Sequence, residues 1–254
     1  MAKLGLQLYS VRTVTPGNLI SVIRDVADMG YQGVEFAGYD GRSAKELAKA
    51  LSDCGIEAAG SHVGYEQFSG DINAVIDYSL ELGLKHVVCP FAMPKKDEET
   101  WGDGWKRIAD DFNVFGEKLR KAGLIFGYHN HQHEFIPQDG VYGMDVLYEN
   151  TDHSLVRFQI DCATVEFSGE FKVIDILNKY EPAVELLHYK DLKAVNVHEA
   201  ITTGDGLVDF KSVSEWGKAH GIPWFVVEYE KKIDDKELLY ADVKRCYDNI
   251  IKFM

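Results

Sequence analysis

The sequence predicts an α/β fold in which eight parallel strands close into a (β/α)8 barrel. Three observations support it. Short apolar runs alternate with segments of helical spacing along the whole chain, and its 254 residues match the ~250 typical of such a barrel. No glycine-rich GxGxxG turn follows the first strand, although this turn usually marks the competing open sheet. We expect one barrel domain over residues 1–254, without a linker.

Strands are expected where apolar, β-branched or aromatic residues form short continuous runs. Runs of this kind, without clean polar alternation, suit strands that are covered on both faces. The eight runs lie at residues 4–9, 33–36, 56–61, 86–90, 125–129, 156–160, 184–188 and 225–228. The segments between them show helical spacing, which is the order of elements that a closed parallel barrel requires.

Helices are expected between these runs, where apolar residues recur on one face. In the first such segment Leu19, Val22, Ile23 and Val26 recur at helical spacing. Ser43, with Glu46 three residues later, predicts a capping box at the start of the second helix. Five glycines lie where a helix end often needs a left-handed residue: Gly30, Gly55, Gly83, Gly123 and Gly221.

Composition limits the class of partner. The formal net charge of −14 argues against nucleic acid and anionic membrane surfaces, whose binding depends on Lys and Arg, and it is compatible with a neutral substrate and a cation. Cys54, Cys89, Cys162 and Cys246 are scattered without a CxxC pair, which favours reduced thiols. With no signal peptide and no apolar run of about 18 residues, a cytoplasmic protein is expected. The oligomeric state stays open, and a homo-oligomer is one option.

Ionisable side chains follow the predicted ends of several strands. In (β/α)8 barrels the catalytic residues come from these C-terminal ends, where they meet although they are far apart in sequence. The candidates are Glu35, His62, His129, His131, His133, Glu134, Asp161, His188, Lys190, Asp191, Glu228 and Glu230. Each one alone is equally explained as a structural histidine, an ion pair or a helix cap. Together they predict a divalent metal, because burying several ionisable groups at one place is costly without a cation.

The type of ligand narrows the choice of metal. Mixed carboxylate and imidazole ligands suit Mn²⁺, Co²⁺, Zn²⁺ or Fe²⁺ better than Ca²⁺, which prefers oxygen ligands throughout. No cysteine stands among the candidate residues, so a thiolate-rich structural zinc site is not expected.

The chain resembles the xylose isomerase-like TIM barrel superfamily, in its sugar phosphate isomerase/epimerase branch. The resemblance runs from end to end on short segments that are specific in their order and spacing. They are residues 6–12, 30–36 (GYQGVEF), 129–135 (HNHQHEF), 159–161, 188–191, 204–209 and 227–230.

The resemblance implies one metal ion held by four ligands from strands 5 to 8, in the order Glu, Asp, His, Glu. Three residues match the last three positions: Asp161, His188 and Glu228. The related epimerases carry the first Glu on strand 5 itself, where this chain has His129. Glu134 on the following loop is therefore the expected first ligand, and His131 is the substitute if the loop points away. Mn²⁺, Co²⁺ or Zn²⁺ is the expected ion.

The same resemblance implies roles in catalysis. Glu134 and Glu228 would remove a proton from one face of the substrate and return it to the other. The residues expected to contact the substrate are His62, His129, His131 and Lys190. Thr164 stands where the epimerases carry a histidine, so their ketose preference does not transfer.

The expected function is therefore a metal-dependent sugar isomerase or epimerase that acts on a small ketose or keto-sugar through an enediolate. The alternative within the superfamily is a lyase, an inosose or keto-sugar dehydratase. A DNA-repair endonuclease is disfavoured by Thr164, by Cys89-Pro90 at the end of strand 4 and by the net charge of −14. A non-catalytic sugar sensor is a fourth hypothesis.

Two smaller features have open interpretations. The stretch from Trp101 to Trp105 either covers the mouth of the barrel as a lid or begins a helix packed on the barrel. Glu35 is either part of the site or a buried carboxylate paired with Arg12.

Overall fold

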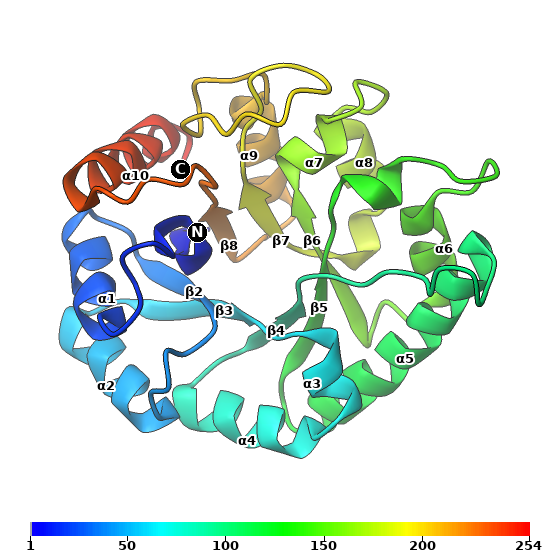
Figure 1. Cartoon of the computed structure of the whole chain (residues 1–254), viewed down its shortest axis with the longest axis horizontal. Coiled ribbons are helices and arrows are strands. Elements are labelled where there is room, and N and C mark those ends of the chain that lie inside the picture. The colour runs from blue at the N-terminus through cyan, green and yellow to red at the C-terminus, as the bar shows by residue number, and fades with distance from the viewer. Residues whose placement is uncertain (1) are drawn as a thin grey trace.

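The computed structural model describes residues 2–254 and shows eight parallel strands closed into a barrel, with helices around it (Figure 1). The strands follow one another in sequence order, and β1 pairs with β8 to close the barrel. They are β1 (Lys3–Gln7), β2 (Gly33–Ala37), β3 (Glu57–His62), β4 (His86–Cys89), β5 (Ile125–His129), β6 (Val156–Asp161), β7 (Val184–Tyr189) and β8 (Trp224–Val227). The predicted (β/α)8 fold is confirmed.

Helices connect the strands and cover the outside of the barrel. They are α1 (Leu19–Asp28), α2 (Ala44–Cys54), α3 (Tyr65–Ser69), α4 (Ile72–Leu82), α5 (Trp101–Lys121), α6 (Gly143–Asn150), α7 (Cys162–Glu166), α8 (Val173–Lys179), α9 (Phe210–Ala219) and α10 (Lys236–Ile250). Short 3-10 helices are η1 (Leu8–Val11), η2 (Gln132–Phe135), η3 (Glu181–Ala183) and η4 (Ile251–Phe253). The predicted apolar face of α1 is buried in the main core, as helical spacing requires.

The helix ends follow the expected local chemistry. The Ser43 side chain accepts from the backbone N–H of Glu46, whose carboxylate accepts from the Ser43 N–H, so the predicted capping box is present. All five glycines expected at helix ends have a positive φ, between 66° and 104°.

Side chains inside the barrel change in character along its axis. Trp224 and Val226 of β8 pack in a small apolar cluster with Leu186 of β7. Because alternate residues of a strand point to the same side, His188 and Glu228 follow Leu186 and Val226 on the inner side. The apolar layer therefore lies beneath a polar layer at the C-terminal ends of the strands, where the candidate residues were predicted.

One local prediction needs correction, and one of two open interpretations is decided. The first strand ends at Gln7 rather than at residue 9, because the Gln7 side chain accepts from the Tyr9 N–H and begins the 3-10 helix η1. The lid interpretation of residues 101–105 is wrong. Trp101 is the first residue of α5, and the fully buried Trp105 stacks on His133 with 5.8 Å between ring centroids.

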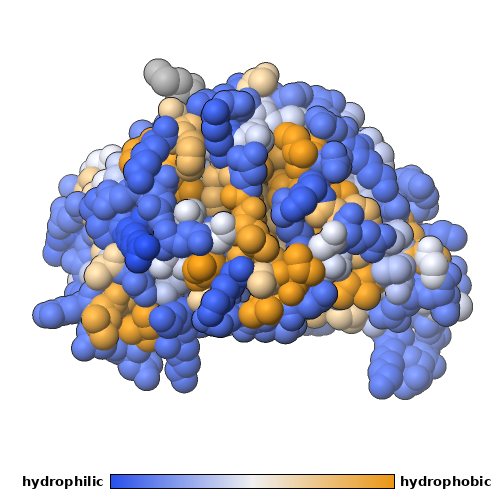
Figure 2. All heavy atoms as spheres, turned by 90° about the horizontal axis from the view of Figure 1, so that it is seen from above, coloured by the Kyte–Doolittle hydropathy of each residue, from blue (hydrophilic) through white to orange (hydrophobic). Residues whose placement is uncertain are grey.

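The four cysteines are free thiols, in agreement with the prediction. Figure 2 shows one face of the molecule, where hydrophilic residues surround smaller groups of hydrophobic ones. Among residues 2–254, no helix combines the length and the apolar character that crossing a membrane would need.

Candidate functional site

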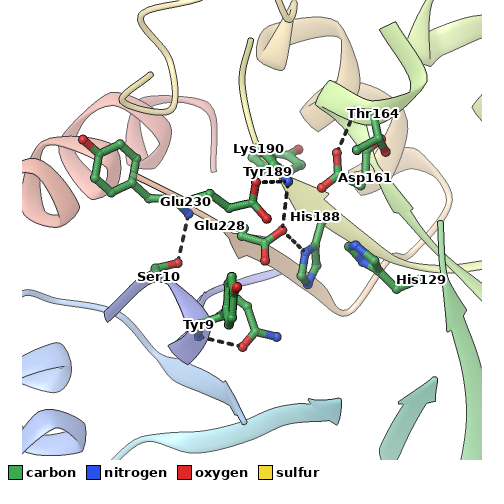
Figure 3. A network of polar contacts seen from close by, with 12 residues as sticks. Tyr9, Ser10, His129, Asp161, Thr164, His188, Tyr189, Lys190, Glu228 and Glu230 are labelled. Carbon is green, nitrogen blue, oxygen red and sulfur yellow. Dashed lines mark hydrogen bonds and ion pairs between the residues drawn. The ribbon is translucent and has the colours of Figure 1, made fainter. Parts of the chain in front are cut away.

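Four buried side chains converge at the C-terminal end of the barrel: His129, Asp161, His188 and Glu228. They come from the ends of β5, β6, β7 and β8, and each offers one ligand atom within 4.8 Å of the others. Figure 3 shows these side chains pointing toward one another from their separate strands. We call these four residues the candidate metal cluster. The fold thus brings together residues that are up to 99 positions apart.

The hydrogen bonding of the two Asp161 carboxylate oxygens indicates that the cluster fits a cation. Its Oδ1 accepts from the backbone N–H of Thr164 at 2.8 Å and so caps α7. Its Oδ2 is buried and has no hydrogen-bond partner. A buried acceptor without a partner is costly, and a metal ion in the cluster would satisfy it. Burial raises the pKa of Asp161 to about 6, so the carboxylate lies in surroundings that disfavour an uncompensated charge.

His188 and Glu228 form the second half of the cluster. His188 Nδ1 lies 3.4 Å from Glu228 Oε2, and His188 Nε2 lies 2.5 Å from Glu35 Oε2. Burial opposes the charge on His188, but the two carboxylates outweigh it and raise the pKa to about 10. Burial likewise opposes the charge on Glu228, yet Lys190 and His188 hold its pKa well below the ordinary range. Glu228 is therefore ionised at neutral pH.

His129 supplies an uncharged imidazole. Burial, followed by the nearby His188 and His62, lowers its pKa well below the ordinary value. A neutral imidazole is the form that binds a metal ion. His129 stands at the strand-5 position that the resemblance implies for the first ligand, and the structure brings it into the cluster.

Glu134 lies apart from the cluster. It belongs to η2 and is fully buried. Its Oε1 accepts from the hydroxyl of Tyr128, and its Oε2 accepts from the backbone N–H of His131 at 2.9 Å. These two donors hold the carboxylate outside the candidate metal cluster. His131 is not in the cluster either; it lines the cavity above it.

The cavity at the mouth of the barrel has a volume of ≈ 330 Å³. This is within the ~300–1,000 Å³ of small-molecule sites. Its lining includes Tyr9, His62, Phe91, His129, His131, Glu228 and Glu230. A neighbouring cavity of ≈ 210 Å³ is lined in part by Thr164, Phe167, Lys190 and Glu230. A small polar molecule in the larger cavity would lie against His129 and Glu228 of the candidate metal cluster.

Lys190 lines the smaller cavity and contacts Glu230, which lines both. Its Nζ is 2.7 Å from Glu230 Oε2 and 3.8 Å from Glu228 Oε2. Burial opposes its charge, but Glu228, Asp161 and Glu230 raise its pKa. The ammonium therefore offsets part of the negative charge of the cluster.

A second polar group lies beside the cluster, and sequence reasoning found only part of it. Glu35 does not pair with Arg12, which instead donates to the carbonyls of Tyr9 and Glu230. Glu35 contacts His188, His62, Gln7 and Gln159. The two glutamines were missed, because an uncharged amide inside a strand carries no signal of its own.

Comparison with known proteins agrees with this architecture. The family model described as xylose isomerase-like TIM barrel matches residues 23–249. The inosose dehydratase of Geobacillus thermodenitrificans is 28% identical over 244 residues, covering 82% of this chain and 81% of that protein. The inosose dehydratase of Bacillus licheniformis is 25% identical and covers 97% and 93%.

Solved structures extend the likeness. A sugar phosphate isomerase/epimerase from Parabacteroides distasonis superimposes with a TM-score of 0.81 at 27% identity, covering 99% of this chain and 98% of that one. An L-ribulose 3-epimerase has the same fold, with a TM-score of 0.75 at 17% identity over 100% and 94% of the two chains. The protein therefore belongs to the xylose isomerase-like TIM barrel family.

Proposed function

We propose that this protein is a divalent-metal-dependent enzyme that moves a proton next to the carbonyl group of a small ketose or keto-sugar, as a sugar isomerase or epimerase. The observation that carries the proposal is the candidate metal cluster, in which Asp161 Oδ2 has no hydrogen-bond partner among residues 2–254. The names of the similar proteins, inosose dehydratases and sugar epimerases, point to the same class of substrate.

His129, Asp161, His188 and Glu228 would hold the metal. Two imidazoles and two carboxylates suit Mn²⁺, Co²⁺ or Zn²⁺. When bound, such an ion polarises a carbonyl group and stabilises the negative charge of an enediolate. Glu134 does not belong to this set, since its two oxygens already accept from Tyr128 and from the backbone.

Glu228 is the proposed base. It lines the cavity and is ionised at neutral pH. Its Oε2 faces His188 and Lys190, which leaves Oε1 to take the proton from the carbon next to the carbonyl. The ammonium of Lys190 would stabilise the negative charge that develops on the substrate. His62 and His131, in the wall of the cavity, would hold substrate hydroxyls.

A dehydratase is the second candidate, and the place of Glu134 favours it. Inversion at a carbon needs a base on one face and an acid on the other. The second carboxylate that would do this in an epimerase is held by Tyr128, outside the candidate metal cluster. Loss of a β-hydroxyl needs only one base and a proton donor for the leaving oxygen, and Glu228 with Lys190 can supply these. The named inosose dehydratases agree with this reaction.

One experiment tests the metal site. After reconstitution with Mn²⁺ and gel filtration, elemental mass spectrometry should find about one metal per chain in the wild type and none in Asp161→Ala. Asp209→Ala, which removes a helix cap outside the cluster, is the matched control and should keep the metal. A wild-type protein without metal would overturn the proposal.

A second experiment separates the reactions. Ketoses and inososes are incubated with the loaded enzyme in deuterated buffer. Deuterium at the α-carbon without loss of water supports an isomerase or epimerase. A product lighter by one water supports the dehydratase. Neither change with any substrate, in a protein that binds metal, would favour the sugar sensor.

A further inference from the structure

The side chains of Gln7, Glu35, His62 and Gln159 form a connected set of hydrogen bonds beside the candidate metal cluster, and we call this set the polar floor. We infer that Glu35 and Gln159 are positioning residues, which determine the ring nitrogen that His188 and His129 each present to the metal. The inference rests on the proposed metal site, and it assigns roles to two residues outside the ligand set.

The hydrogen-bond directions in the polar floor follow from one backbone amide. The N–H of Tyr9 can only donate, and it points to Gln7 Oε1 at 3.0 Å. The other end of the Gln7 amide is therefore its NH₂ group, which donates to Glu35 Oε2 at 2.7 Å. The Tyr9 N–H thus fixes the orientation of the Gln7 amide.

The hydrogen bonds of Glu35 determine which ring nitrogen of His188 carries a proton. Its Oε1 accepts from Gln159 Nε2 at 2.7 Å, and its Oε2 lies 2.5 Å from His188 Nε2. A carboxylate that accepts from two amides requires the third partner to donate as well. His188 therefore carries a proton on Nε2, and Nδ1, which lies 3.4 Å from Glu228 Oε2, is the nitrogen that faces the candidate metal cluster.

The orientation of the Gln159 amide determines which ring nitrogen of His129 carries a proton. Since its NH₂ group donates to Glu35, its Oε1 must accept, from His129 Nδ1 at 2.9 Å and from His62 Nε2 at 2.8 Å. His129 therefore carries a proton on Nδ1 and presents Nε2 to the metal. The two histidine ligands would bind through opposite nitrogens.

The packing around Glu35 supports a fixed position. Its side chain is fully buried, and a Cβ on Gly60 would lie 2.9 Å from Glu35 Oε1. Gly60 thus leaves the space that the carboxylate fills. Outer partners of this kind orient metal-binding imidazoles, and their loss costs about 10–100-fold in metal affinity.

The same directions decide between two possible metal groups. His62, His129 and His188 also offer ligand atoms within 4.8 Å of one another. Each of these rings, however, directs one nitrogen as a donor to Gln159 or Glu35. One nitrogen of each ring is thus engaged by Gln159 or Glu35, whereas the cluster with Asp161 and Glu228 includes the unpartnered Asp161 Oδ2 and is the group assigned to the metal.

The test measures tautomers and affinity rather than turnover. Long-range ¹H–¹⁵N NMR of Zn²⁺-loaded protein should show His188 protonated on Nε2 and His129 protonated on Nδ1. By competition with a chelator, Glu35→Gln should bind Zn²⁺ about 10–100-fold more weakly than the wild type. The matched control is Glu185→Gln, which alters a similar carboxylate contact to His86 (3.1 Å) three residues before His188 on the same strand. It should keep the wild-type affinity.

The opposite tautomer at either histidine, or a folded Glu35→Gln protein with an affinity within twofold of the wild type, would overturn the inference. If Glu35→Gln does not fold, the tautomers of the wild type still decide. If the wild type binds no Zn²⁺, the proposed function fails separately. The tautomer of His129 in the metal-free protein then tests the Gln159 contact by itself.

Discussion

Replacing Asp161 by asparagine should stabilise the metal-free protein and abolish its response to metal. The variant keeps an oxygen to accept from the Thr164 N–H, so the cap of α7 survives. It removes a buried charge whose second oxygen has no partner. The pKa of Asp161 is raised from 3.8 to about 6, mainly by burial, and this difference corresponds to about 3 kcal/mol of folding free energy that the ionised carboxylate costs.

The sign follows from the direction of the shift. A group with a raised pKa in the folded state contributes stability below its unfolded value, and this contribution is lost as the pH rises through the folded value. Wild type and Asp161→Asn should therefore differ little near pH 4. The variant should be more stable by up to about 3 kcal/mol at pH 8. Metal at 100 times its Kd should stabilise the wild type by about 2.7 kcal/mol and leave the variant unchanged.

Urea denaturation with chelator and with Mn²⁺, at pH 4 and pH 8, measures all of these differences. Asp209→Asn, at the cap of α9, is the control and should change stability by less than about 1 kcal/mol without altering the response to metal. The reasoning is refuted if metal-free Asp161→Asn is less stable than the wild type at pH 8 and Mn²⁺ still stabilises it. Asp161 would then be a helix cap and no ligand.

Three further predictions follow from the site and its surroundings. Glu228→Gln should slow exchange of the substrate α-proton with solvent by about 10²–10⁴-fold, measured by NMR in deuterated buffer; exchange at the wild-type rate would assign the base elsewhere. Burial raises the pKa of Glu134 to about 8, so metal-free wild type should lose stability between about pH 4.5 and 8 relative to Glu134→Gln, and parallel denaturation curves would contradict this. Gly206→Ala should cost about 1–3 kcal/mol while metal content stays unchanged, since its Cβ would lie 2.4 Å from Asp191 Oδ1 and from the Leu192 carbonyl; wild-type stability would show that the loop adapts.

The place of Glu134 shows where sequence reasoning reached its limit. The order of residues 129–135 put a carboxylate near the end of β5, and the resemblance suggested that it binds metal. Whether a loop carboxylate turns inward depends on which donors meet it. Here the carboxylate meets the hydroxyl of Tyr128, whose ring packs against Trp105 and Phe112 of α5, and the backbone N–H of His131. The spacing of residues along the sequence does not predict which donors the Glu134 carboxylate meets.

The polar floor illustrates the same limit. Glu35 stood out as a carboxylate within an apolar strand, but Arg12 was the wrong partner. The actual partners, Gln7, Gln159 and His188, lie on β1, β6 and β7 and meet only because the barrel closes. Amide side chains gave no sign of this in the sequence, since they have neither charge nor hydrophobic pattern.

By itself, the sequence determined the barrel, its capping glycines and the strand ends that carry Asp161, His188 and Glu228. These features depend on local propensity and on hydrophobic periodicity, both of which follow from the order of residues in the sequence. The tertiary structure alone decided that His129 completes the cluster, that Glu134 stays outside it and that Glu35 contacts His188. Such contacts depend on distances of a few ångströms between strands, and only the closed barrel sets those distances.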